Sequence, residues 1–174
     1  METAPAIRIG IAFVQFFLIA LLLPLIPALL FGLSFPATLA LMASGFIIEY
    51  GASPLGIGLK LPPVFVLFVL VCIAAGTMLL LFDLFRLIGD SSIRISRFLE
   101  KARIRAQGSR IISRYGIWGL IPCVWILGFY VCTPVAWVLG WNRTHAIAIT
   151  LAGFIFAATI TILASMGLFA VLFH

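Results

Sequence analysis

Residues 61–82 read LPPVFVLFVLVCIAAGTMLLLF, a stretch of 22 residues that carries no charged side chain. About 20 apolar residues in a helix cross the hydrocarbon core of a bilayer, so this stretch predicts a membrane span that starts at the Pro62–Pro63 pair. The composition agrees, because 64% of the 174 residues are apolar and only 9% are charged. Soluble domains carry about 25% charged residues. The chain is therefore not a soluble globular, disordered or disulfide-stapled protein.

The segment that follows this span, residues 86–114, is strongly basic, and its excess of positive charge equals the formal net charge of +6 of the whole chain. Basic connections stay on the cytoplasmic side of a membrane, so we expect this one to be cytoplasmic. An apolar stripe between residues 95 and 106 predicts a basic amphipathic helix on the membrane surface. Because the patch lies between hydrophobic spans, we expect no nucleic acid as partner. We expect anionic lipid headgroups at Arg94, Arg97, Lys101, Arg105 and, near a second interface, Arg143.

On either side of these two elements the chain is largely apolar. Residues 9–33 and 144–173 predict two further spans, the first of them kinked near Pro24 and Pro27 because proline removes a helical hydrogen bond.

Two other segments, residues 34–58 and 115–142, contain too many glycines and prolines to form continuous helices. Irregular backbone at membrane depth survives only when it is buried in protein or lines a wet cavity. Each segment therefore predicts a re-entrant hairpin, and the cytoplasmic connection requires that the two hairpins enter from opposite faces.

The predicted fold is a single-domain, all-α integral membrane protein. It has about three full transmembrane helices, two Gly/Pro-broken re-entrant hairpins in an inverted-repeat arrangement, and the basic cytoplasmic helix. Paired broken segments in two halves of a chain point to a transporter site. Three full spans are few to enclose a transport pathway, so we expect a homodimer or a membrane hetero-complex.

Glu49 is the acid that lies deepest within an apolar segment. A charge at the centre of a bilayer costs about 2.5–3.5 kcal/mol, so it needs a partner, a wet cavity or a proton. In one interpretation Glu49 exchanges a proton for a substrate, with Gly51 and Pro54 in the same binding region. In the other, its carboxylate accepts hydrogen bonds from free N–H groups of the glycine-rich turn that follows it.

The second hairpin supplies the opposing candidates. Aromatic residues beside broken backbone could stack on an organic cation, although Trp and Tyr also concentrate at membrane interfaces. Such aromatic residues include Trp125, Tyr130 and Trp137. The candidates for substrate binding are Trp125, Gly128, Thr133 and Pro134. No catalytic triad, phosphate-binding loop or metal-ligand cluster can be assembled from the sequence, so we expect no enzyme activity, no cofactor and no metal.

Residues 47–63, IIEYGASPLGIGLKLPP, resemble the small multi-drug export protein family of prokaryotic membranes, whose motif has the form E-x-R-G-x-I-P-L-G-I followed by G-L-P-P. Residues 115–120, YGIWGL, look like the second half of that family, and the resemblance extends roughly over residues 46–167. It implies a distant kinship with DedA-type proteins, which have paired re-entrant hairpins and roles in transport or with lipid carriers.

Together these features predict a small multi-pass transporter or exporter of organic or lipid-linked substrates in the prokaryotic cytoplasmic (inner) membrane, coupled to protons through Glu49. The alternative is a non-catalytic structural or accessory subunit of a larger membrane complex, which kept the fold and lost the transport motifs. The retained Glu49 favours transport, whereas the missing arginine of the family motif favours the alternative.

Overall fold

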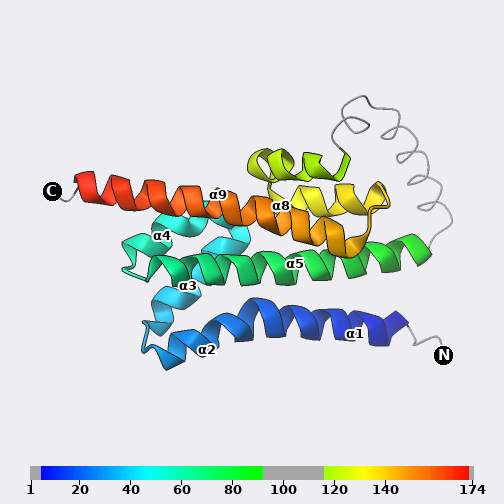
Figure 1. The fold of residues 1–174 in the computed structure, drawn as a ribbon. Coiled ribbons are helices and arrows are strands. Elements are labelled where there is room, and N and C mark those ends of the chain that lie inside the picture. Colours follow the sequence, from blue (N-terminus) through cyan, green and yellow to red (C-terminus); the bar gives the residue numbers. More distant parts are fainter. Residues whose placement is uncertain (1–4, 92–115, 173–174) are drawn as a thin grey trace.

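The computed structural model describes residues 5–91 and 116–172, and every regular element within these ranges is a helix (Figure 1). Five helical segments of the described chain are long and apolar enough to cross a membrane. The predicted all-α membrane fold is thereby confirmed. The predicted amphipathic surface helix lies outside the described residues, together with Arg94, Arg97, Lys101 and Arg105.

The first hydrophobic segment changes its helical form just before its prolines. α1 (Pro5–Phe16) passes into a π-helical stretch, η1 (Phe17–Leu22), which is followed by α2 (Leu23–Leu30). The ring of Pro24 crowds the carbonyl one turn earlier, and a π-helical turn accommodates such a displaced carbonyl. Ala20, within η1, is buried against α5 at Gly76, where an added Cβ would lie 2.9 Å from the Ala20 Cβ.

The next segment turns back on itself. α3 (Phe35–Ile48) runs from the end of α2 toward the middle of the molecule, and α4 (Ser53–Gly58) returns to the end where α5 begins (Figure 1). Between them lies a short 3₁₀ turn, η2 (Glu49–Ala52). We refer to residues 35–58 as the first hairpin.

α5 (Pro63–Ser91) is a long helix that contacts most of the other elements. The first hairpin lies close to it at Gly56, where an added Cβ would come within 2.7 Å of a Val66 methyl group.

The second half repeats this reversal from the other end. After η3 (Gly116–Gly119), α8 (Leu120–Val138) is interrupted at Gly128, whose φ of 74° and ψ of 174° lie outside the helical region. The first part of α8 runs toward the middle of the molecule, and the second part returns toward the end from which it came (Figure 1). We refer to residues 116–138 as the second hairpin.

α9 (Arg143–Leu172) packs along the second hairpin and α5 and ends at the opposite end of the molecule (Figure 1). Gly153 permits a close approach, because an added Cβ would lie 3.2 Å from the Cα of Ile121. Large apolar side chains also lie on the outer surface, among them Ile47 and Ile126, which are more than 80% exposed. Such a surface suits contact with lipid chains or with other membrane helices.

Candidate functional site

The two hairpins meet at their breaks. The carboxylate of Glu49 accepts a hydrogen bond of 3.2 Å from the backbone N–H of Phe129, and the N–H of Tyr130 comes next in the same turn. These residues follow Gly128 and form the first turn of the returning part of α8. Free N–H groups and a partial positive charge at a helix N-terminus make a binding site for an anion. Here that anion is a side chain from the other hairpin. We call the contact of Glu49 and Tyr50 with Trp125–Tyr130 the junction.

The donor of this hydrogen bond, the N–H of Phe129, lies 80 residues away from Glu49 along the chain. The sequence suggested instead that a structural Glu49 would accept hydrogen bonds from the turn that directly follows it. A tertiary contact therefore supplies a partner that local spacing does not reveal.

Gly128 is suited to the junction in two ways. Its φ of 74° with ψ of 174° is a conformation that only glycine adopts readily. In addition, a Cβ at this position would collide with the carboxylate of Glu49. The absence of a side chain at Gly128 is thus what allows the carboxylate to reach the N–H groups behind it.

Two tyrosines cross the junction in opposite directions. The Tyr50 hydroxyl donates a hydrogen bond of 2.8 Å to the carbonyl of Trp125, and the Tyr130 hydroxyl donates one of 2.7 Å to the carbonyl of Phe46. Both carbonyls lie in the last turn before a break, where helical carbonyls lose their partners. Each hairpin therefore caps the broken helix of the other.

Tyr50 was not among the candidates that the sequence predicted, and Tyr130 was named there only as an aromatic residue of the second hairpin, without this hydrogen bond. The available signal was their position, since Tyr50 directly follows Glu49 and Tyr130 lies two residues after Gly128. A hydroxyl beside a helix break within an apolar segment can satisfy a backbone group that the break leaves free.

Aromatic rings close the junction on one side. Phe129 and Phe154 are at most 1% exposed, and their ring centroids lie 5.4 Å apart in an edge-to-face arrangement. Tyr50 packs on the same Phe154 ring at 6.1 Å. The Trp125 ring lies against Phe156 instead, so Trp125 serves the junction through its carbonyl. The predicted stacking of an organic cation on the second hairpin stays a prediction.

The remaining candidates lie near the breaks and have local roles. Gly51 lies in the 3₁₀ turn, where an added Cβ would come within 2.7 Å of an Ile48 methyl group, and Pro54 lies in the first turn of α4. Thr133 is buried, and its hydroxyl donates a hydrogen bond of 2.7 Å to the carbonyl of Phe129 in its own helix. Pro134 follows in the same helical part. A role in substrate binding stays a prediction for all four.

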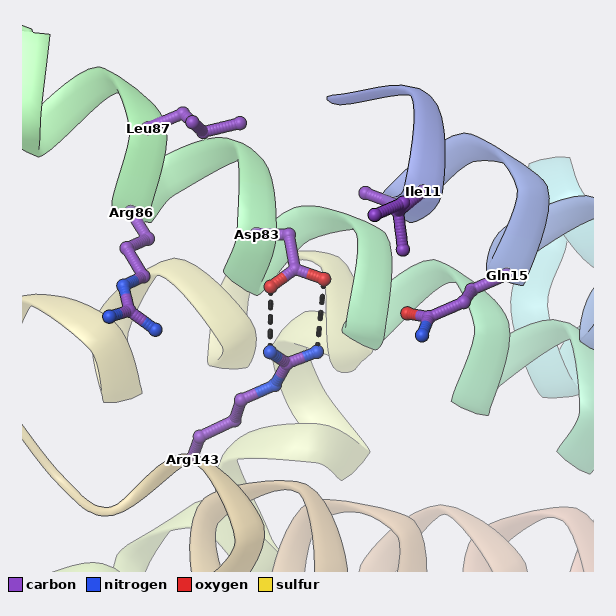
Figure 2. Close-up of a pocket in the computed structure, with 7 residues that line it drawn as sticks. Ile11, Gln15, Asp83, Arg86, Leu87 and Arg143 are labelled. Carbon is purple, nitrogen blue, oxygen red and sulfur yellow. Dashed lines mark hydrogen bonds and ion pairs between the residues drawn. The ribbon is translucent and has the colours of Figure 1, made fainter. Parts of the chain in front are cut away.

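A second polar site lies where α5 and α9 contact one another. Arg143, at the start of α9, donates two hydrogen bonds of 2.6 and 3.0 Å to the two carboxylate oxygens of Asp83 on α5 (Figure 2). The side chains are 39% and 22% exposed, respectively. Arg143, which we expected to contact lipid headgroups, thus has a protein partner and remains accessible as well.

The apolar helices and the two hairpins define a multi-pass α-helical membrane protein of the kind in which broken helices meet. Comparison with family models then names the family. The model of the small multi-drug export protein family matches residues 49–160, so the chain belongs to this family. The match begins at Glu49 and includes both breaks. No curated protein and no solved structure matches the chain significantly.

Proposed function

We propose that the chain exports organic or lipid-linked substrates across the cytoplasmic membrane of a prokaryote. In this proposal the two hairpins are re-entrant, the basic connection 86–114 faces the cytoplasm, and the junction is the gate. The observation that carries the proposal is the Glu49 carboxylate on the backbone N–H of Phe129, at the point where the two breaks meet. The family name, which refers to export, supports the same proposal.

The chemistry of this contact suits coupling to protons. An ionised Glu49 makes charge-assisted hydrogen bonds, which are roughly twice as strong as neutral ones, and it faces the positive end of a helix. A proton on Glu49 removes both advantages and weakens the junction. A cationic or polar group of a substrate competes for the same carboxylate. The proton and the substrate therefore cannot occupy Glu49 at the same time. Such mutually exclusive binding allows the protein to exchange one for the other across the membrane.

The backbone at Glu49 also supports a functional role. Its φ of 56° and ψ of −128° are unusual for a residue with a side chain. Such a conformation costs about 1–3 kcal/mol and concentrates at functional sites, where the surrounding structure enforces it. In the first hairpin it directs the carboxylate across to the second.

The alternative function is that of a structural or accessory subunit. It is favoured by the junction itself, because the carboxylate already has a backbone donor and the neighbouring rings pack on one another. In this alternative Glu49 joins the two hairpins and nothing else, and the outer apolar surface is the place where a homodimer or hetero-complex forms.

The test is transport by the purified chain in proteoliposomes under an imposed pH gradient. Organic cations such as ethidium, and polyprenyl phosphates, serve as substrates, and proton release on substrate addition is recorded in parallel. E49Q keeps the shape and the acceptor oxygen of the side chain but cannot titrate. Tyr50→Phe is the matched control, because it loosens the junction and leaves the carboxylate in place.

We expect gradient-driven efflux and proton release from the wild type and from Tyr50→Phe, and loss of both from E49Q. Equal efflux by a well-folded E49Q would exclude proton coupling through Glu49. Absence of transport by the wild type, together with copurification of a stoichiometric partner, would support the accessory subunit.

A further inference from the structure

A cleft of about 320 Å³ lies between the second half of α1, the last part of α5 and the start of α9 (Figure 2). It is separate from the junction and is built around the Asp83–Arg143 ion pair. Arg86 stands one turn further along α5, and the amide of Gln15 on α1 points toward the ion pair (Figure 2).

The cleft has more hydrogen-bond donors and more positive charge than its own groups use. Among the described residues that line it, Asp83 is the one acid, and both of its oxygens already accept hydrogen bonds from Arg143. A guanidinium has five N–H groups, so three remain on Arg143. Arg86 is exposed, and the described residues give it no ion pair. Two guanidinium groups against one carboxylate leave an excess of one positive charge, which favours an anion.

The other wall of the cleft is apolar. Ile11 and Ala12 of α1 and Leu87 of α5 line it. The apolar stretches of these two helices extend over Ile9–Leu30 and Pro63–Leu87, so the cleft lies within two turns of the end of each stretch. In a bilayer this is the depth at which phosphate groups meet the first carbons of the acyl chains.

From these contacts we propose that the cleft binds an anionic phospholipid, with its phosphate between Arg86 and Arg143 and the start of an acyl chain along Ile11. The planar guanidinium fork matches the geometry of a phosphate. The bound phosphate uses the free N–H groups of Arg143, so the ion pair with Asp83 stays closed. The site shares no residue with the junction, so its test does not depend on the proposed transport.

The test is native mass spectrometry of the full chain in neutral detergent, titrated with phosphatidylglycerol and, separately, with phosphatidylcholine. Arg86→Gln removes one cationic group of the cleft and leaves Asp83–Arg143 intact. Lys60→Gln is the matched control, since it removes the same charge from the turn between α4 and α5 at the other end of the molecule. Thermal unfolding verifies that both variants are folded.

We expect the wild type to bind phosphatidylglycerol more tightly than phosphatidylcholine. A basic residue beside an anionic lipid contributes about 1 kcal/mol, so Arg86→Gln weakens phosphatidylglycerol binding about fivefold. Lys60→Gln leaves it unchanged. An equal loss in both variants would show diffuse attraction to charge and overturn the proposal. Displacement of the lipid by millimolar inorganic phosphate would also overturn it, because the cleft would then be a site for a free anion.

Discussion

Replacing Gly128 by alanine changes two things at the junction at once. The new residue must adopt φ of 74° and ψ of 174°, and its methyl group must occupy the space of the Glu49 carboxylate. The carboxylate then has to leave the N–H of Phe129, which remains in the interior of the molecule with its donor free.

The cost follows from these two effects. A residue with a side chain in this backbone region costs about 1–3 kcal/mol. Loss of a hydrogen bond to a charged group costs about 1.5–3 kcal/mol more. We therefore expect Gly128→Ala to lower the free energy of unfolding by about 2.5–6 kcal/mol, a large part of the stability of a domain of this size.

The assay is equilibrium unfolding in detergent, followed by helical circular dichroism. Gly32→Ala is the matched control, because Gly32 also has a positive φ, 61°, but no atom lies within 4 Å of an added Cβ. It should cost only the backbone part, about 1–2 kcal/mol. A double-mutant cycle with Glu49→Ala isolates the collision, since without the carboxylate Gly128→Ala should cost only its own backbone part, about 1–3 kcal/mol.

Two outcomes would refute this reasoning. One is a Gly128→Ala variant within about 0.5 kcal/mol of the wild type, the range of ordinary surface substitutions. The other is the same cost for Gly128→Ala with and without Glu49, which would show that the carboxylate does not lie against Gly128.

Two further substitutions test the packing of the halves by the same unfolding assay. Tyr50→Phe removes the hydroxyl that bonds the Trp125 carbonyl, and it should cost about 0.5–1.5 kcal/mol; no loss would mean that this carbonyl has another donor. Gly76→Ala forces a methyl group against Ala20 and should cost about 1–3 kcal/mol. Gly10→Ala meets nothing within 4 Å and should be neutral or stabilising, so equal effects at the two glycines would contradict the close helix contact.

Much of the fold could be predicted because its causes are local. The charge-free run at residues 61–82 is recognisable as a helix, and α5 contains it as Pro63–Ser91. The helix continues beyond the run to Ser91, and Asp83 in this continuation pairs with Arg143, which lies 60 positions away in the sequence. The sequence predicted a kink of the first span near Pro24 and Pro27. The departure from regular α-helix that the structure shows is a π-helical stretch N-terminal to both prolines, at residues 17–22.

The importance of Glu49 was also visible in the sequence, because an acid within an apolar segment must find compensation. The hydrogen-bond partner of Glu49, in contrast, could not be seen in the sequence. The second hairpin contains several glycines and prolines that could break a helix, and only the packing of α5, α8 and α9 brings the break at Gly128 beside Glu49. The hydrogen bond of Tyr130 could not be predicted for the same reason, because its acceptor belongs to the other hairpin.

The 80-residue separation between Glu49 and Phe129 also has a consequence during synthesis. Ribosomes add about 5–20 residues per second, so Phe129 follows Glu49 by roughly 4–16 s. For that interval the nascent first hairpin holds a carboxylate that has no donor from its eventual partner. We therefore expect the tip of the first hairpin to contact water or the insertion machinery during this interval. It reaches its final position only after the second hairpin has been synthesised and has packed against it.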